Sequence, residues 1–142
     1  MSWQTQLRGD SVSWLLNSDS SNVRYLAMRD LLDLPPEDKK VKAARKMAHK
    51  EGPIPQILSK MNEEGWWRRP GTGYGPKYKS TVWALILLAQ LGGSVKEDKR
   101  IKQACKYYLD HALNSDGQIS GMTNNSPSGT FDCLQGNMLW SL

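Results

Sequence analysis

The sequence has few of the features that indicate a disulfide framework, a membrane span or a metal centre. It contains only two cysteines, Cys105 and Cys133, which lack the spacing of a zinc motif, so buried apolar thiols are the favoured interpretation. The longest hydrophobic run, residues 82–91, includes Gln90 and is about half as long as a bilayer-spanning helix. We therefore expect no transmembrane segment, no metal site and no cofactor.

The amino terminus also lacks the apolar core and the small-residue cleavage site of a secretion signal. A cytoplasmic location is the expected default. What the chain does have is an excess of bases, with a formal net charge of +5 and a pI near 9.3. Its hydrophobic content of 39% is ordinary for a soluble protein, and 142 residues fit one domain.

An internal repeat is the most informative pattern in the chain. Residues 97–106, EDKRIKQACK, restate residues 37–46, EDKKVKAARK, with conservative changes at most positions. Each copy is followed by a turn that begins with asparagine and ends with glycine, at 62–65 and 114–117, and then by an apolar segment. The first copy also contains an insertion at 49–55, where Gly52 and two prolines break one helix and start a shorter one. Such self-similarity is typical of repeat architectures.

Hydrophobic spacing predicts helices along nearly the whole chain. One helix is expected to begin at Ser20, Ser21 or Asn22 and to end before Pro35, and it would form a hairpin with the segment around 14–16. Further helices are expected at 37–50, 82–91, 97–113 and 131–142. The segment 82–91 is apolar on every side, which predicts a helix that other elements surround.

These features predict an all-α fold of helical hairpin repeats in one domain, residues 1–142. Its parts are an N-terminal helical hairpin at 1–36, a first repeat at 37–92 and a truncated second repeat at 97–142. Because the last helix is apolar and has no capping residues, we expect a truncated chain, a homodimer or a partner that supplies the missing half. Truncation is slightly favoured.

The alternation of inner and outer helices, with turns at Gly65-Trp66-Trp67 and Asp116-Gly117, resembles the α/α-toroid superfamily of terpenoid cyclases and protein prenyltransferase β subunits. Gly65-Trp66-Trp67 fits the Gly-x-Trp ending of the cyclases' repeat motif, whereas the second copy has Gln118-Ile119 in place of the aromatics. The resemblance covers most of the chain from about residue 37 onward. It implies a partial toroid whose concave face holds an apolar or isoprenoid-like ligand.

The catalytic motifs of that superfamily are absent from the chain. It has neither the Asp-x-Asp-Asp of one cyclase class nor the Asp-Asp-x-x-Asp that binds diphosphate through magnesium. The prenyltransferase zinc site has an aspartate and a cysteine separated by one residue, but here Asp132 and Cys133 are adjacent and no histidine follows them. We therefore expect ligand binding and assign no catalytic residue.

The best candidate site is the segment 66–80, which combines bases and aromatic residues with no acid and leads into the apolar helix. Its glycines at 71, 73 and 75 do not have the spacing of a phosphate-binding loop. Aromatic faces beside arginines suit a diphosphate-bearing isoprenoid, stacked bases or an acidic peptide. The candidate ligand-binding residues are Trp66, Trp67, Arg68, Arg69, Tyr74, Lys77, Tyr78 and Trp83.

The same loop also has a purely structural interpretation, which is the favoured one. In it, Trp66, Trp67 and Tyr74 fasten the loop over the ends of neighbouring helices while the bases stay in water. Two polar residues inside apolar helices, Gln90 and Asn137, must either find partners or line a cavity.

A second functional hypothesis comes from the basic residues between 39 and 50. A helix with this charge could bind an acidic protein or nucleic acid through its outer face, in a salt-sensitive way. The alternative, an ordinary solvated helix face, is favoured about two to one, because the apolar stripe is thin and lacks the aromatic residues of a membrane-binding helix.

Overall fold

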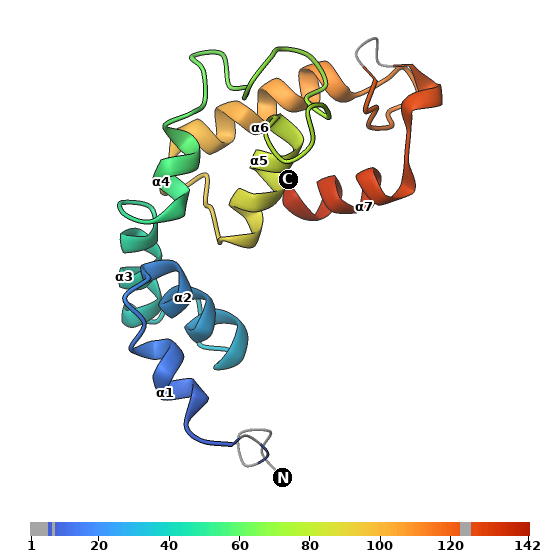
Figure 1. Ribbon diagram of the computed structural model, residues 1–142. Coiled ribbons are helices and arrows are strands. Elements are labelled where there is room, and N and C mark those ends of the chain that lie inside the picture. Colours follow the sequence, from blue (N-terminus) through green and yellow to red (C-terminus); the bar gives the residue numbers. More distant parts are fainter. Residues whose placement is uncertain (1–5, 7, 123–125) are drawn as a thin grey trace. The chain divides into compact units, whose positions relative to one another are not determined.

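The computed structural model describes residues 6, 8–122 and 126–142, which form helices joined by loops (Figure 1). Apart from two isolated β-bridges, the described residues contain no extended pairing, so the all-α prediction is confirmed. Within the same residues, no helix has both the length and the hydrophobicity needed to cross a membrane. The α-helices are α1 (Ser11–Leu16), α2 (Ser21–Leu26), α3 (Lys39–Ala48), α4 (Pro53–Leu58), α5 (Thr81–Gln90), α6 (Lys99–Ala112) and α7 (Asp132–Ser141).

Two further helical segments complete the fold: a π-helix, η2 (Ala27–Leu31), that continues α2, and a 3-10 helix, η3 (Pro127–Gly129). The chain divides into two compact units, Met1–Pro55 and Gln56–Leu142. The boundary between them lies within α4 and inside the predicted first repeat, 37–92. As a result α3 belongs to the first unit, whereas α5, α6 and α7 belong to the second.

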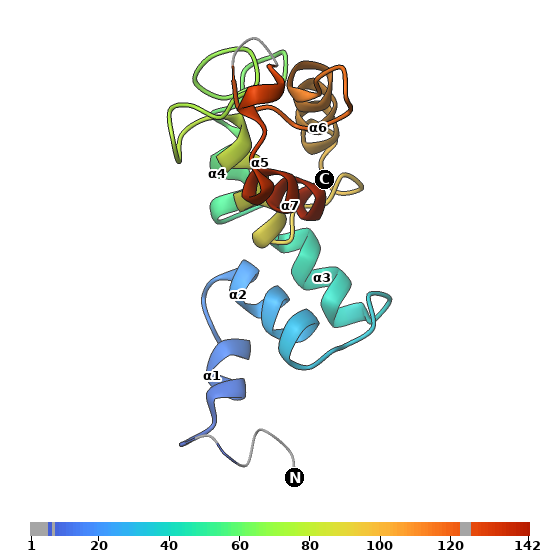
Figure 2. The same cartoon turned by 90° about the vertical axis from the view of Figure 1, so that its right-hand side faces the viewer.

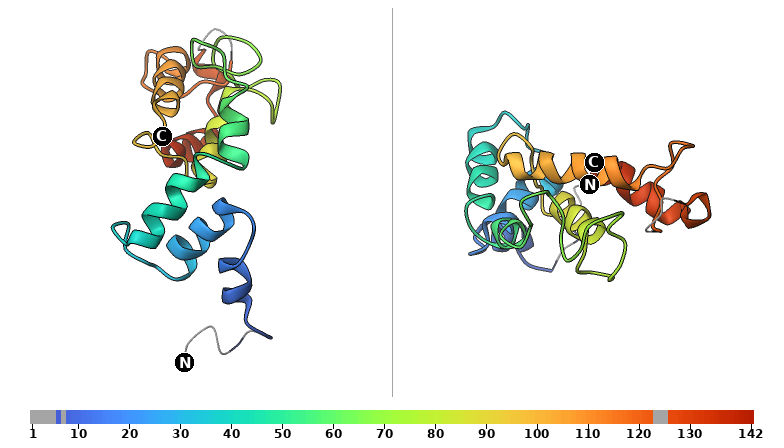
Figure 3. Two further views of the ribbon diagram at one scale, coloured as in Figure 1. Left: turned by 90° about the vertical axis from the view of Figure 1, so that its left-hand side faces the viewer. Right: turned by 90° about the horizontal axis from the view of Figure 1, so that it is seen from above.

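In the first unit, α2 and α3 pack side by side (Figure 3). Their contact buries Tyr25, Val41 and Ala44, against which Leu26 and Leu34 also pack. The helix predicted to begin near residue 20 does so, because the Ser20 hydroxyl accepts a hydrogen bond from the Val23 amide at 3.5 Å.

In the second unit, α5 packs against both α6 and α7, as Figures 1 and 2 show. One face of α5 supplies Val82, Leu85 and Leu88 to the core, each at most 2% exposed. The other two helices complete the core with Ile101, Ala104 and Tyr108 from α6 and with Leu134 and Met138 from α7. Burial of this apolar surface is the main stabilising contribution to the unit.

The ten-residue sequence match is reproduced as two helix starts of the same kind. Asp38 caps α3 and accepts a hydrogen bond from the Lys40 amide at 2.7 Å, and Asp98 caps α6 by accepting from the Arg100 amide at 2.9 Å. The predicted break after α3 is also present, since Gly52 has a φ of +87° and α4 starts at the next residue.

The two turns that end in glycine share a second geometry. In each turn, the asparagine side-chain oxygen accepts hydrogen bonds from backbone N–H groups of the turn. Their lengths are 2.9–3.1 Å in the first turn and 2.9–3.0 Å in the second. In each turn, the backbone N–H of the asparagine also donates a hydrogen bond to the backbone carbonyl of the residue four positions later, and the glycine has a positive φ. The residues concerned are Asn62, Gly65 and Trp66, and Asn114, Gly117 and Gln118.

The close approach of the first turn to α6 explains why a glycine is needed there. A Cβ atom added to Gly65 would lie 3.1 Å from the Gln103 carbonyl oxygen and 3.2 Å from the Tyr107 Cβ. The Gln103 side-chain amide also donates a hydrogen bond to the Glu63 carbonyl. The turn is thereby fastened to α6, and it sets the direction in which the following loop leaves.

Two neighbouring leucines of α5 allow a test of the assignment of its core face. We expect Leu88→Ala to lower the free energy of unfolding by about 2–5 kcal/mol, because it opens a cavity in the core. Leu87→Ala, on the opposite face, should lower it by about 1 kcal/mol or less. Urea denaturation of both variants is the measurement, and equal losses would contradict the orientation of α5.

Candidate functional site

The second face of α5 is apolar but is not covered by the rest of the fold. Trp83, Ile86, Leu87 and Gln90 follow one another at the spacing of a single helix face. Leu87 is 44% exposed, so the prediction that this helix is surrounded on every side is wrong for this face. The apolar residues that made the segment look fully buried belong to two faces with different surroundings.

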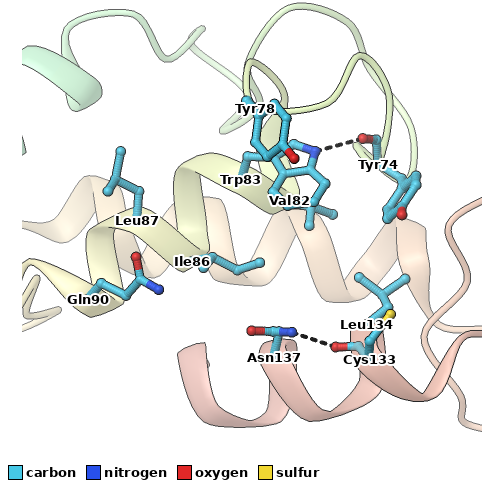
Figure 4. A pocket seen from close by; sticks show the side chains of 10 residues that line it. All are labelled: Tyr74, Tyr78, Val82, Trp83, Ile86, Leu87, Gln90, Cys133, Leu134 and Asn137. Atoms are coloured by element: carbon cyan, nitrogen blue, oxygen red, sulfur yellow. Dashed lines mark hydrogen bonds between the residues drawn. The ribbon is translucent and has the colours of Figure 1, made fainter.

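This uncovered face lines a pocket of about 390 Å³ (Figure 4). The loop before α5 forms one wall of the pocket, and the first turns of α7 form another. The lining residues are Tyr74, Tyr78, Val82, Trp83, Ile86, Leu87, Gln90, Cys133, Leu134 and Asn137. All of them belong to the second unit.

Hydrogen bonds to buried groups hold the loop at the start of α5. The Gly73 carbonyl accepts from the Val82 amide at 3.1 Å, and the Trp67 amide donates to the Thr81 hydroxyl at 3.1 Å. Gly73 has a φ of +68°, and an added Cβ would lie 2.5 Å from the Thr81 Cβ, so only glycine allows this approach. The loop is therefore fixed against α5 and places Tyr74 at the pocket.

Helix α5 begins at the predicted position, but it is not capped as a serine usually caps a helix. Ser80 is the N-cap residue, yet its hydroxyl donates to the Pro76 carbonyl at 2.9 Å and makes no bond to an amide of the first turn. The hydroxyl instead ties the helix start to the end of the loop.

Three aromatic side chains form one end of the pocket. The ring centroids of Tyr74 and Tyr78 lie 5.8 Å and 4.8 Å from that of Trp83, in tilted arrangements. The Trp83 indole N–H donates to the Tyr74 carbonyl at 2.9 Å, as the dashed line in Figure 4 shows. Because that donor is already used, Trp83 offers the pocket only its apolar ring surface.

Tyr78 occupies an unusual backbone conformation at the mouth of the pocket. Its φ is +63°, a left-handed value that costs a non-glycine residue about 1–2 kcal/mol, and its side chain is 77% exposed. Strained residues of this kind tend to occur at binding sites, where the surrounding structure holds them. Here the strained residue places its aromatic ring beside that of Trp83.

The rest of the pocket is aliphatic with two amide side chains. Gln90 lies about two helical turns from Trp83 along α5, and Asn137 lies about one turn from Cys133 along α7. The Asn137 amide nitrogen donates to the Cys133 carbonyl at 2.7 Å, whereas the Gln90 side chain makes no hydrogen bond with another described residue. Of the two alternatives expected for these amides, a partner or a cavity, Gln90 lines the pocket, and Asn137 both lines the pocket and has a partner.

The structure brings together Tyr74, Tyr78 and Trp83 from the predicted site, but not the other candidates. Trp67 is 4% exposed, and its indole N–H donates to the Ile57 carbonyl at 2.8 Å, which is a packing role. The Trp66 indole donates to the Glu64 carboxylate at 2.9 Å. Neither indole lines the pocket.

The bases of the loop also lie outside the pocket. Arg68, Arg69 and Lys77 are all exposed, and the Arg69 guanidinium donates to the Gly75 carbonyl at 3.0 Å. Trp67 and the bases therefore behave as the structural interpretation of the loop predicts: Trp67 packs inside the unit, and the bases are exposed to water. The apolar lining residues that the sequence did not single out are Val82, Ile86, Leu87, Cys133 and Leu134. Their only sequence signals were two apolar helices, one containing Gln90 and the other containing Asn137.

Neither charged side chains nor a metal cluster is found at this site. No lysine, arginine, aspartate or glutamate lines the pocket. Across the described ranges, no three histidine, cysteine, aspartate or glutamate side chains lie together as a metal site would require.

Comparisons with known proteins do not add a family to this description. No family model matches the chain, and no curated protein or solved structure matches it. The resemblance to the terpenoid cyclases and prenyltransferases therefore stays a prediction.

The two thiols differ in exposure, and the prediction that both are buried is wrong for Cys133. Cys133 is exposed because it lies on the pocket side of α7, and Cys105 is half-buried on α6, where burial raises the pKa of its thiol. Because the thiolate is the nucleophile, we expect iodoacetamide at pH 7.5 to modify Cys133 at least about ten-fold faster than Cys105.

Mass spectrometry of Cys105→Ala and Cys133→Ala gives each rate separately. Because burial raises the pKa of the Cys105 thiol, the rate at Cys105 should continue to rise as the pH is raised into the alkaline range. Equal rates at pH 7.5 in the folded protein would contradict the placement of the two helices.

Proposed function

We propose that this protein binds an apolar or isoprenoid-like small molecule in the pocket between α5, α7 and the loop that precedes α5. The observation that carries the proposal is the uncovered apolar face of α5, which lines a pocket together with Tyr74, Tyr78 and Trp83. A ligand that covered this face would remove apolar surface from water, at about 25 cal/mol per Å². The volume of about 390 Å³ lies at the lower end of the range for small-molecule sites.

The proposal is one of binding and assigns no reaction. No carboxylate lines the pocket, so it lacks an acid that could protonate an alkene or hold magnesium. Any turnover would need residues from elsewhere.

We also propose that the second unit is part of an α/α toroid. Support comes from the matched turns at Asn62 and Asn114 and from the two apolar helices, α5 and α7, that follow those turns within the second unit. In a toroid, further inner helices would continue the layer that α5 and α7 begin. Either a second copy of the chain or further helices would then cover Leu139 and Trp140, which are 76% and 61% exposed on α7.

Two exposed leucines separate pocket binding from general adsorption to apolar surface. Leu87 is 44% exposed and lines the pocket, whereas Leu139 is 76% exposed and does not. We expect Leu87→Asp to weaken the binding of farnesol by at least about ten-fold, because a carboxylate is costly to desolvate. Leu139→Asp should change it by less than about two-fold.

Calorimetric titration of each variant with farnesol is the measurement, and thermal unfolding verifies that both are folded. Equal effects of the two substitutions would show that farnesol adsorbs non-specifically. Failure of the unsubstituted chain to bind would contradict the proposal itself.

A second candidate function is the binding of an acidic protein or nucleic acid by α3. The observation that favours it is that Lys39, Lys40, Lys46 and Lys50 are all exposed and make no ion pair with a described residue. Among the other bases, Lys42 of α3 is paired with Glu37, and Arg100 and Lys106 of α6 are paired with Asp98 and Asp110. A polyanion would release counterions from such a face, so its binding would be sensitive to salt.

The charge on α3 can be tested against the similar charge on α6. For binding to single-stranded RNA, the salt dependence is the slope of log affinity against log salt concentration. We expect the double variant Lys39→Gln, Lys46→Gln to reduce the magnitude of this slope by about two. The matched double variant on α6, Lys99→Gln, Lys102→Gln, should leave that slope nearly unchanged. Fluorescence anisotropy at several salt concentrations measures both, and equal slopes would contradict a role for α3.

A further inference from the structure

The chemistry of the pocket wall restricts the charge of what it can hold, and this inference rests on the proposed function. The ten lining residues include three aromatic rings, four aliphatic side chains, two amides and a thiol, with no charged group. A diphosphate placed here would lose hydration without gaining an ion pair, which is strongly unfavourable. The bases of the loop, such as Lys77, are exposed to water and do not line the pocket.

The polar groups of the pocket are not used equally. The Trp83 indole N–H is bonded to the Tyr74 carbonyl, and the Asn137 amide nitrogen is bonded to the Cys133 carbonyl. The Gln90 amide has no such bond within the described part of the chain, and neither has the Asn137 side-chain oxygen. Figure 4 shows Gln90 along α5 from Trp83, and Asn137 on α7 below Ile86. These amides therefore offer both a donor and an acceptor to a neutral polar group.

We propose that the ligand is an uncharged molecule with a hydrophobic chain or ring system ending in a hydroxyl, carbonyl or amide group. The hydrophobic part lies against Trp83, Ile86 and Leu134, with Tyr74 and Tyr78 at its end. The polar group exchanges hydrogen bonds with the side-chain amides of Gln90 and Asn137. The site thus takes an isoprenoid alcohol in preference to the corresponding diphosphate.

Three probes with the same carbon chain test this assignment: farnesol, farnesyl diphosphate and the hydrocarbon farnesene. Binding is read out in the full chain by calorimetry and by the protection of Cys133 from iodoacetamide, in a Cys105→Ala background that leaves one thiol. We expect farnesol to bind at least about ten-fold more tightly than farnesyl diphosphate and about three- to ten-fold more tightly than farnesene.

Two substitutions at Gln90 sharpen the test, because the residue is exposed and its replacement does not disturb the core. Gln90→Leu should bring the affinity for farnesol down to that for farnesene, since it removes the amide while keeping the side-chain bulk. Gln90→Lys should strengthen the binding of the diphosphate relative to the alcohol, since it places an ammonium group beside the pocket. Thermal unfolding verifies that both variants remain folded.

The possible outcomes separate this inference from the proposal on which it rests. If none of the three probes binds and none protects Cys133, the proposed function is wrong. If the probes bind but the affinity for farnesyl diphosphate equals or exceeds that for farnesol, only the neutral-ligand assignment is overturned. Equal binding of farnesol and farnesene, with no effect of Gln90→Leu, would overturn the role of the amides.

Discussion

The structure of the second unit depends on the fact that α5 is apolar on two opposite faces. One face gives Val82, Leu85 and Leu88 to the core shared with α6 and α7, and it is buried. The other face places Trp83, Ile86 and Leu87 beside a pocket. The free energy gained by burying the first face holds the helix in place, and the second face is then available for contact with something else. An apolar surface in this position is typical of a small-molecule site.

The loop before α5 converts that face into a pocket. Gly73, with a positive φ, allows the loop to approach Thr81, and the Gly73 carbonyl accepts a hydrogen bond from the Val82 amide. Tyr74 and Tyr78 then lie beside Trp83, with their ring centroids 5.8 Å and 4.8 Å from it. The aromatic end of the pocket thus depends on the backbone conformations of Gly73 and Tyr78, which both have a positive φ. The bases of the loop remain in water, and the pocket consequently has no charge.

The positions of the helices could be predicted from the sequence because their signals are local. Ser20 marks a helix start and Gly52 a helix end, since capping and left-handed backbone depend on single residues. The helices expected from residues 37 and 97 begin two residues later, because Asp38 and Asp98 are their N-caps. The candidate site was predicted only in part. Tyr74, Tyr78 and Trp83 line the pocket, whereas Trp67 packs inside the unit. Composition cannot distinguish an aromatic residue that packs from one that lines a pocket, because the difference depends on which helix lies opposite.

Farnesol binding to the α5 face can be observed directly by methyl NMR of the full chain labelled at its isoleucines. Ile86 lines the pocket, whereas Ile54 and Ile101 are 0% and 6% exposed elsewhere. We expect farnesol to shift the Ile86 δ1 methyl signal in a saturable way and to leave the signals of Ile54 and Ile101 nearly unchanged. Saturable shifts at the other isoleucines with none at Ile86 would contradict the account, because the ligand would then bind away from α5.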